Sequence, residues 1–368
     1  MKRPLRRASL ARLRVSIKMN LGSGFRVRGC GPDRPEPGAP NPERERPAVI
    51  VIGALSFTAL LTSCAASAKF MAVNIPVSDL RAQPKTTAQP AVHDPAEETQ
   101  LVYGERVRVL AVKDGWAQVE AIEQSEMTHA GRWQGYPGWL PASTLLPWDP
   151  LEAPNVVVVE KWTDVWRDAY TQDKLSWRFP LGTRLRATDI GGVLWRVELL
   201  DGTQVWLQHR AACSLPKLRA QPPSEQRRAI LRNAQLMIGD AYYWGGRSPQ
   251  SPERTSAVTG VDCSGLVNLA YRAAGLDIPR DAHEQFLRAH AAKTLQPADL
   301  IFLSERGNPK RIVHVMLYAG DGQLIEGPGT GAAVRRIALA QRLGQPLDRL
   351  APGSVVDGQT VFFGSYLD

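Results

Sequence analysis

Residues 72–148 contain short runs in which hydrophobic and polar positions alternate, separated by turn residues. The runs over 101–110 and 115–120 alternate in this way, and a Gly-Tyr-Pro-Gly-Trp-Leu segment over 135–140 ends the unit. Alternation with a period of two is typical of a strand with one face on a core and the other in water. Several short strands at this spacing predict a small β-barrel, with the Pro- and Thr-rich residues 83–99 as a surface loop.

The same pattern returns over residues 155–216, which begin with a β-branched run. Two copies of one module, each of about sixty to eighty residues, are the simplest account of this repetition. One larger β-sandwich is the alternative. The runs of the second copy that resemble strands of the first are 182–187, 193–198 and 204–207.

Residues 224–368 have a different pattern. A polar, Pro-containing linker over 217–223 precedes a segment over 225–238 with a helical period, which we expect Ser224 to cap. Another amphipathic helix is expected to begin near Leu266. Helices followed by an antiparallel sheet predict an α+β domain. The predicted strands are 299–303, 312–318, 323–326 and 360–363.

The N-terminal segment adds a targeting signal. Residues 48–61 form an uncharged apolar run, too short to span a bilayer comfortably and typical of a secretory signal. Leu-Thr-Ser-Cys follows and resembles a bacterial lipobox, so we expect residues 48–64 to be a lipoprotein-type signal with Cys64 lipidated. A plain signal peptide cleaved near 65–68, or a membrane anchor, is the alternative. The basic residues 1–47 are interpreted as a start site placed too far upstream, or as a disordered leader.

Charge excludes nucleic acid as the partner. The 368 residues carry a formal net charge of +9, but residues 1–47 hold 12 basic and 4 acidic residues. The remaining 321 residues hold 33 basic and 32 acidic residues and are therefore almost neutral. A near-neutral body lacks the basic surface that binds DNA or RNA. The expected location is the periplasm or cell envelope, with acyl chains holding the protein at a membrane.

The candidate chemistry centres on Asp-Cys-Ser-Gly-Leu over 262–266. Cys263 is expected at the start of a helix, where the positive end of the helix dipole favours the reactive thiolate. His314 follows 51 residues later on a predicted strand and is the candidate base. A structural role is the ordinary alternative for both residues. If Cys64 is lipidated, only Cys213 and Cys263 remain beyond it, and we expect no structural disulfide.

A base needs a partner that orients it, and Glu326 is the candidate. It lies twelve residues after His314, across a predicted Gly-containing turn. In an antiparallel hairpin the two side chains share a face if the loop has an odd number of residues. With a three-residue loop, the carboxylate would accept a hydrogen bond from the imidazole and stabilise the imidazolium. A solvated carboxylate on an edge strand is the alternative.

These motifs resemble a known family. Tyr-x-Trp-Gly-Gly, Asp-Cys-Ser-Gly-Leu, Pro-Arg-Asp-Ala-x-x-Gln, Asp-Leu-Ile-Phe and His-Val-x-x-Tyr are similar to motifs of the NlpC/P60 papain-like cell-wall peptidases. The two upstream modules resemble bacterial SH3 (SH3b) domains. The resemblance implies a multi-domain chain: two small all-β SH3b barrels (72–150 and 155–216), followed by an α+β papain-like NlpC/P60 domain (224–368), as in YkfC-like γ-D-glutamyl-L-diamino acid endopeptidases.

By this resemblance, Cys263 is the nucleophile, His314 the base, and Glu326 occupies the third catalytic position, where the family most often has His. The side chain of Tyr242 would form an oxyanion hole with the Cys263 backbone N–H. Asp281 would bind the free N-terminal amine of the substrate, although it could also cap a helix over 282–290, and both roles can hold together. The further substrate-binding candidates are Glu105, Tyr136, Trp244 and Arg280.

The implied function is hydrolysis of the γ-D-Glu–diamino acid bond in peptidoglycan stem peptides, with preference for a free N-terminal L-Ala. No cofactor motif and no His/Cys cluster with metal-ligand spacing is present in the sequence. The alternatives are another papain-like amidase or transpeptidase acting on cell-wall peptides, and an inactive wall-binding scaffold. The diamino acid preferred, the biological role and the oligomeric state do not follow from the sequence.

Overall fold

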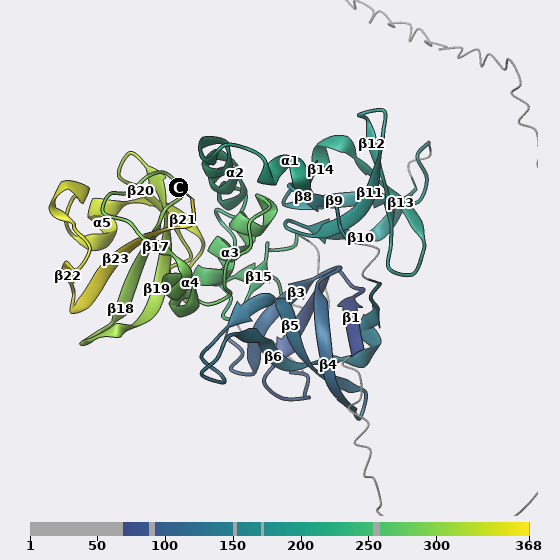
Figure 1. Cartoon of the computed structure of the whole chain (residues 1–368), viewed down its shortest axis with the longest axis horizontal. Coiled ribbons are helices and arrows are strands. Elements are labelled where there is room, and N and C mark those ends of the chain that lie inside the picture. The colour runs from purple at the N-terminus through teal and green to yellow at the C-terminus, as the bar shows by residue number, and fades with distance from the viewer. Residues whose placement is uncertain (1–68, 88–92, 150–152, 171–172, 253–257, 368) are drawn as a thin grey trace, which may run out of the picture. The chain divides into compact units, whose positions relative to one another are not determined.

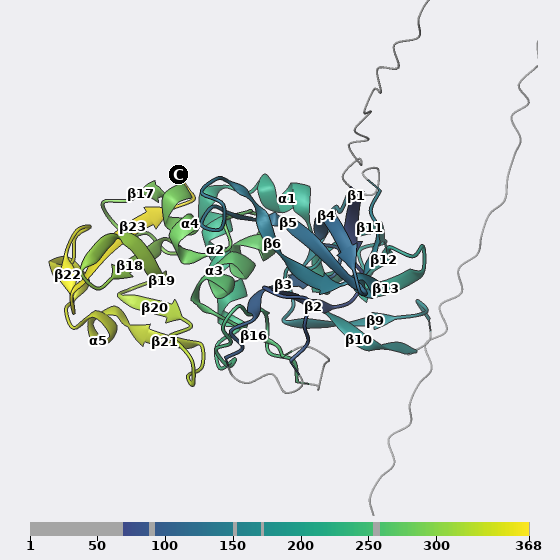
Figure 2. The same ribbon diagram turned by 90° about the horizontal axis from the view of Figure 1, so that it is seen from below.

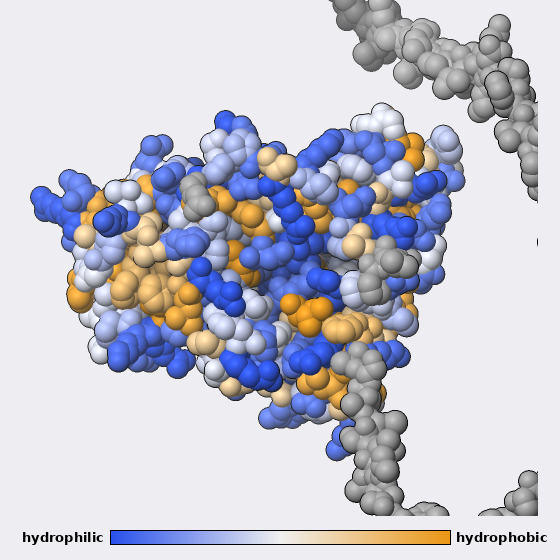
Figure 3. All heavy atoms as spheres, in the orientation of Figure 1, coloured by the Kyte–Doolittle hydropathy of each residue, from blue (hydrophilic) through white to orange (hydrophobic). Residues whose placement is uncertain are grey.

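The computed structural model describes residues 69–87, 93–149, 153–170, 173–252 and 258–367. The predicted signal segment, the lipidation site Cys64 and the basic leader lie outside the described residues. Among the residues described, no helix is long and apolar enough to cross a membrane. On the face drawn in Figure 3, hydrophilic residues surround smaller apolar patches, which is ordinary for a surface in contact with water.

Two seven-stranded antiparallel sheets lie in the N-terminal half, each with its own hydrophobic core (Figure 1). The first, called the first β module, has the strand order β3-β2-β6-β5-β4-β1-β7. Its elements are β1 (Lys69–Val73), β2 (Val77–Arg81), β3 (Glu97–Val102), β4 (Arg106–Lys113), β5 (Trp116–Glu126), β6 (Gln134–Pro141), the short 3-10 helix η1 (Ala142–Thr144) and β7 (Leu145–Pro147).

The second β module repeats this order strand for strand, as β10-β9-β13-β12-β11-β8-β14. A 3-10 turn precedes the last strand in both modules. The repetition predicted from the sequence is therefore present in the topology, and the sheets are separate rather than parts of one sandwich. The elements are β8 (Val156–Val158), β9 (Trp162–Trp166), β10 (Lys174–Pro180), β11 (Arg184–Ile190), β12 (Leu194–Glu198), β13 (Gln204–Gln208), η3 (His209–Ala211) and β14 (Ala212–Ser214).

Three local expectations were wrong. The alternating run over 101–110 is broken between β3 and β4, where Gly104 has a φ of +80°. The stretch predicted as a surface loop ends in β3, where Thr99 is buried. The predicted linker over 217–223 contains most of helix α1 (Leu215–Arg219), because Ser214 caps it and Leu215 and Leu218 bury their side chains.

The C-terminal domain follows the predicted α+β layout. Helix α2 (Pro223–Gln235) begins two residues earlier than expected, so Ser224 lies inside its first turn. The N-cap residue is Pro222, whose side chain has no hydrogen-bond acceptor. Figure 1 shows α2 and α3 side by side next to the C-terminal sheet. The other helices are α3 (Cys263–Ala273), α4 (Ala282–Arg288), α5 (Leu339–Leu343) and the 3-10 turn η4 (Leu347–Arg349).

The C-terminal sheet has the order β17-β23-β18-β19-β20-β21, with β22 paired to β23. Helices α2 and α3 pack against one face, and α5 covers part of the other, beside β20 and β21 (Figure 2). The strands are β17 (His290–Ala291), β18 (Leu300–Glu305), β19 (Asn308–Gly320), β20 (Gln323–Glu326), β21 (Arg335–Ala338), β22 (Val355–Val356) and β23 (Gln359–Ser365). The short pair β15 (Arg247–Ser248) and β16 (Gly260–Val261) precedes α3.

Buried arginines join α3 to both β modules. Arg272 of α3 pairs with Glu123 of β5 at 2.9 Å and donates to the Gly182 carbonyl at 2.9 Å. Arg247 pairs with Glu105 at 2.8 Å, with both side chains only 1% exposed. Separating a buried ion pair leaves an uncompensated charge, which is strongly destabilising. These contacts therefore hold the modules against the helix that begins at Cys263.

Candidate active site

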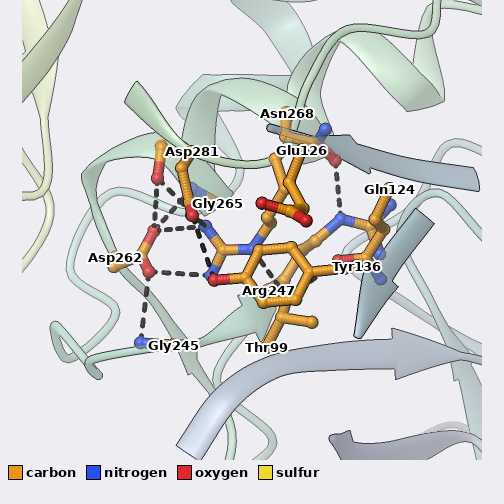
Figure 4. A network of polar contacts seen from close by, with 12 residues as sticks. Thr99, Gln124, Glu126, Tyr136, Gly245, Arg247, Asp262, Gly265, Asn268 and Asp281 are labelled. Carbon is orange, nitrogen blue, oxygen red and sulfur yellow. Dashed lines mark hydrogen bonds and ion pairs between the residues drawn. The ribbon is translucent and has the colours of Figure 1, made fainter. Parts of the chain in front are cut away.

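Cys263 is the first residue of α3, and Asp262 fixes the start of that helix. The Asp262 carboxylate accepts hydrogen bonds from the backbone N–H groups of Gly265, at 2.6 Å, and Gly245, at 3.1 Å (Figure 4). An acceptor at this position satisfies an N–H group that the helix itself leaves unpaired. One side chain therefore joins the helix start to the preceding Gly-Gly turn and holds the thiol at the positive end of the helix.

The glycines of both motifs are required by close packing. A Cβ on Gly265 would lie 2.2 Å from the Gly246 carbonyl oxygen, and a Cβ on Gly246 would lie 2.4 Å from the Gly260 carbonyl oxygen. Both contacts are with backbone, which cannot swing aside. The Tyr-x-Trp-Gly-Gly turn and the Asp-Cys-Ser-Gly-Leu helix start are thus two halves of one tightly packed unit.

His314 and Glu326 are brought together by the β19–β20 hairpin. Leu317 pairs with Ile325 and Tyr318 with Leu324, and the register then shifts before Gly320. Gly320 pairs with Gln323, so the turn has two residues rather than the expected three. The extra residue at the register shift restores the odd count, so His314 and Glu326 share a face as diagonal rather than direct neighbours. The His314 Nε2 and a Glu326 carboxylate oxygen are 3.0 Å apart. Glu326 is fully buried, which excludes the solvated alternative.

The second nitrogen of the His314 ring is available to Cys263, whose side chain is a hydrogen-bonding neighbour of the imidazole. Burial disfavours the charged imidazole, but the hydrogen bonds and negative charges of Cys263 and Glu326 outweigh it and raise the pKa of His314 to about 9. Burial also opposes ionisation of Glu326, yet His314, Arg335 and Arg342 lower its pKa to about 2. The arrangement therefore favours a protonated imidazole beside the Glu326 carboxylate.

A cleft of about 720 Å³ opens beside this group. Cys263, His314, Tyr242 and Trp244 line it, as expected. Tyr242 is almost fully buried, and burial together with the nearby Cys263 and Asp262 raises the pKa of its phenol. A protonated hydroxyl beside the sulfur can donate a hydrogen bond, as an oxyanion hole requires.

A second set of residues in the cleft, called the acidic cluster, consists of Glu98, Asp281 and Glu284 together with Tyr136 and His129. The Tyr136 hydroxyl donates to Asp281 at 3.0 Å, as Figure 4 shows. Burial, opposed by Arg280 and reinforced by Asp262 and Glu284, raises the pKa of Asp281 to about 6. Asp281 stands at the N-cap position of α4, but its side chain makes no capping hydrogen bond. Its carboxylate therefore faces the cleft rather than the helix.

Two of the predicted substrate-binding residues lie elsewhere. Glu105 is buried against Arg247 and Arg272 and does not line the cleft. Arg280 is fully buried, and its guanidinium donates to Asp262, Ser264 and Thr99 rather than entering the cleft. Both predictions are corrected. These side chains already make ion pairs and hydrogen bonds with neighbouring residues, and they stabilise the structure around the cleft without lining it.

Sequence analysis missed several polar residues of the site. Glu98 precedes Thr99 in a stretch predicted as a loop, and Glu284 lies in a helix where only Asp281 had been considered. One Glu284 oxygen accepts hydrogen bonds from Thr128, while the other has no partner among the described residues. The signal available was an acidic residue three positions from Asp281, which one helical turn brings to the same side.

His129 is a further residue that the sequence did not single out. Its ring lies 5.2 Å from the Tyr136 ring, and hydrogen bonds to Glu98 and Glu126 outweigh burial and raise its pKa to about 9. No group of three or more His, Cys, Asp or Glu residues that could hold a metal occurs in the part of the chain that is described. Cys213 and Cys263 are both free.

Comparisons with known proteins agree with this geometry. Residues 239–346 match the NlpC/P60 family. The chain is 27% identical over 248 residues to a γ-D-glutamyl-L-lysine dipeptidyl-peptidase of Bacillus cereus, covering 66% of this chain and 70% of that protein. It is 26% identical to the Bacillus subtilis protein of the same name, covering 67% and 77%.

A crystal structure of an NlpC/P60 family protein from Bacillus cereus has a TM-score of 0.63, at 21% identity, and covers 81% of this chain and all of that one. At this identity the likeness concerns the fold. The cysteine at the start of α3, the histidine on β19 and the family match over 239–346 agree: the C-terminal part of this chain contains an NlpC/P60 domain.

Proposed function

We propose that this protein is an exported cysteine endopeptidase that hydrolyses the γ-D-Glu–diamino acid bond of peptidoglycan stem peptides and prefers a free N-terminal L-Ala. The relatives named above are dipeptidyl-peptidases for a γ-D-glutamyl-L-lysine bond, and they match about two thirds of the chain. The observation that carries the proposal is one cleft in which Cys263 and His314 share a wall with the acidic cluster.

The chemistry begins with the Cys263 thiolate attacking the γ-carbonyl of D-Glu. The carbonyl electrons move to oxygen, where Tyr242 and the Cys263 backbone N–H donate hydrogen bonds. The His314 imidazolium then gives its proton to the departing amine of the diamino acid, leaving a thioester on Cys263. A water molecule, losing its proton to His314, attacks the thioester and releases L-Ala-γ-D-Glu while the thiol is regenerated.

The acidic cluster supports recognition of an ammonium group. Asp281 and Glu98 line the cleft as carboxylates, and Tyr136 fixes the direction of Asp281. A free α-amine would be positively charged and would pair with these carboxylates. An acylated amine offers no charge, so the carboxylates would remain desolvated and unpaired. This selects released stem peptides over stems still linked to the glycan.

The first β module supplies part of this pocket, because Glu98 and Tyr136 come from β3 and β6. We assign both β modules as SH3b domains, over 72–150 and 155–216, ahead of a catalytic domain over 224–368. In this assignment the first module is a wall of the active site rather than a tethered binding domain. The repeated strand order of the two modules supports their common origin.

Export and lipid anchoring rest on the sequence alone. The apolar run over 48–61 and the lipobox-like Cys64 favour a mature protein held at a membrane surface, in the periplasm or cell envelope. Metabolic labelling with a radiolabelled or clickable fatty acid tests this. We expect label on the full-length protein and none on a Cys64→Ser variant. Equal labelling of both would contradict lipid anchoring through Cys64.

The decisive experiment for the function compares two synthetic peptides, L-Ala-γ-D-Glu-diamino acid and its N-acetylated form. We expect hydrolysis of the first at the γ bond, at least about 100-fold faster than the second, since unpaired buried carboxylates weaken binding by several kcal/mol. Equal rates on both would overturn the amine preference. Cleavage at another bond would favour a different cell-wall amidase, and transfer to an added amine would favour a transpeptidase.

The inactive-scaffold alternative depended on Glu326 being unable to replace the usual third residue. The 3.0 Å contact with His314 argues against this, because the carboxylate is placed to orient the ring. A protein that binds sacculi but cleaves neither peptide, nor any other stem peptide, would restore the scaffold interpretation.

A further inference from the structure

Glu326 makes more charged contacts than its role as a partner of His314 requires. One carboxylate oxygen accepts from Arg335 at 2.7 and 3.0 Å, and Arg342 donates to both oxygens at 2.9 and 3.1 Å. Glu326 is fully buried, whereas the side chains of Arg335 and Arg342 are 45% and 25% exposed. The two guanidinium groups thus cover the solvent side of a carboxylate whose other side faces the imidazole.

The fold places both arginines by regular structure. Glu326 and Arg335 are direct partners in the β20–β21 pairing. Arg342 stands on α5, which is held against the sheet by the buried Leu339 and Leu343. A cross-strand position and a packed helix therefore aim two permanent positive charges at one buried carboxylate.

The two arginines change how strongly the His314–Glu326 pair holds protons. A buried carboxylate beside an imidazole raises the proton affinity of the pair, because the desolvated negative charge attracts any available proton. With Glu326 alone, the site would tend to hold one proton more, and the sulfur would keep its hydrogen. Arginine stays protonated at every accessible pH, so two guanidinium groups lower that proton affinity without exchanging protons themselves.

We propose that Arg335 and Arg342 are positioning residues that keep Glu326 ionised and oriented, so that the proton released by Cys263 stops at His314. The inference rests on the proposed function for its purpose, but thiol chemistry can test it without any substrate. Arg335 lies outside the residues that line the cleft, whereas Arg342 is among them. The position of Arg335 supports action through Glu326, and a test without substrate is needed to show the same for Arg342.

The other charged and titratable groups that the structure describes near the His314–Glu326 pair do not contact Glu326. Cys263 of α3 faces the imidazole, and Tyr242 and Asp262 flank the sulfur. His283 of α4 accepts a hydrogen bond from the Ile312 backbone N–H, and Arg311 lines the cleft. Among the described residues, the cations that pair with Glu326 are His314, Arg335 and Arg342.

The test follows iodoacetamide alkylation of the Cys263 peptide by mass spectrometry in the full-length protein, as a function of pH. In the Arg335→Gln/Arg342→Gln variant we expect the half-point of alkylation to move up by about one pH unit, the usual scale of a charge within hydrogen-bonding distance. The Arg335→Lys/Arg342→Lys variant keeps the charge and should restore most of the shift. Alkylation of Cys213 in the same samples is the internal control.

The same substitutions made in a Glu326→Gln variant show whether the arginines act on Cys263 through Glu326. In Glu326→Gln the carboxylate is absent, so adding the two Gln substitutions should move the half-point by less than half as much. An equal shift in both backgrounds would mean that the arginines act directly on the sulfur or ring, and no shift in either would mean that they only stabilise the fold; both results overturn the proposal. Failure to cleave any stem peptide would overturn the proposed function while leaving this readout intact.

Discussion

The Tyr136 hydroxyl of the first β module donates a hydrogen bond to the Asp281 carboxylate of the catalytic domain, with 3.0 Å between the oxygens. Tyr136 is 4% exposed, and burial together with the Asp281 charge raises the pKa of its phenol, so the hydroxyl remains a donor. One hydrogen bond thus ties the wall of the cleft to the carboxylate that we propose binds the substrate amine. The cleft that we propose binds the substrate is complete only when the first β module is folded against the C-terminal domain.

Removing this hydrogen bond should weaken binding rather than chemistry. For Tyr136→Phe we expect KM for the free-amine peptide to rise about tenfold, with kcat nearly unchanged, because a hydrogen bond to a charged group contributes roughly 1.5–3 kcal/mol. Steady-state kinetics on L-Ala-γ-D-Glu-diamino acid measures both constants. A fall in kcat at unchanged KM would instead place Tyr136 in the chemical step.

Glu98 and Glu105 should behave in opposite ways. Glu98→Gln removes a carboxylate from the cleft and should lower kcat/KM for the free-amine peptide while leaving the melting temperature almost unchanged. Glu105→Gln leaves Arg247 and Arg272 with less negative charge in a buried site and should lower the free energy of unfolding by on the order of 3 kcal/mol.

Denaturant unfolding and kinetics on the same two proteins check this pair. If Glu105→Gln is as stable as the unchanged protein but binds the free-amine peptide poorly, Glu105 is a substrate residue after all and the correction made above fails.

The pH dependence of kcat/KM should have two limbs set by His314 and Asp281. The imidazolium, whose pKa is raised to about 9, is present below that pH, so activity should fall as the pH rises through about 9. On the free-amine peptide this limb begins near pH 8, because the substrate α-amine loses its own proton at about that pH. Asp281, whose pKa is raised to about 6, is neutral below that pH and loses its attraction for ammonium, so activity on the free-amine peptide should fall below about 6.

The Asp281→Asn variant assigns the acid limb. It should have a low kcat/KM that no longer falls through pH 6, while the alkaline limb stays near 9. If kcat/KM of this variant still falls through the same pH, a group other than Asp281 causes the loss of activity in acid.

The glycine pair at the start of α3 should be intolerant of any side chain. In Gly246→Ala the new Cβ would lie 2.4 Å from the Gly260 carbonyl oxygen, so strand β16 or the turn before it must move. We expect loss of activity and a lower melting temperature. Gly239→Ala is a comparison without a clash, since nothing lies within 4 Å of a Cβ there. Its φ of +91° strains an alanine by itself, so only a larger loss in Gly246→Ala supports the clash. Equal stability of Gly246→Ala and the unchanged protein would contradict the packing described here.

The candidate catalytic group could be predicted from sequence because most of its geometry is local. Cys263 follows a capping aspartate at a helix start, and the parity of one hairpin puts Glu326 on the face of His314. The observed two-residue turn would by itself put the two side chains on opposite faces. The extra residue at the register shift before Gly320 restores the shared face, and the sequence did not predict that shift.

The substrate pocket could not be predicted in the same way, because it depends on contacts between distant segments. Glu98 approaches Asp281 only after a β module and the catalytic domain have packed together, and no periodicity records that packing. Glu105 was named instead through the family resemblance, and in sequence a carboxylate in a β turn looks the same whether it faces a cleft or a buried arginine. The contacts of Arg335 and Arg342 with Glu326 could not be predicted either, because they depend on the β20–β21 register and on the position of α5.

The most direct test of the account is the acyl-enzyme on Cys263. Full-length protein mixed with the free-amine peptide, quenched in acid within one turnover and digested, should carry an L-Ala-γ-D-Glu thioester on the peptide that contains Cys263. His314→Ala should lack it under the same conditions. Continued hydrolysis of the peptide by Cys263→Ala, or an adduct on another residue, would contradict the claim that this sulfur attacks the γ-carbonyl.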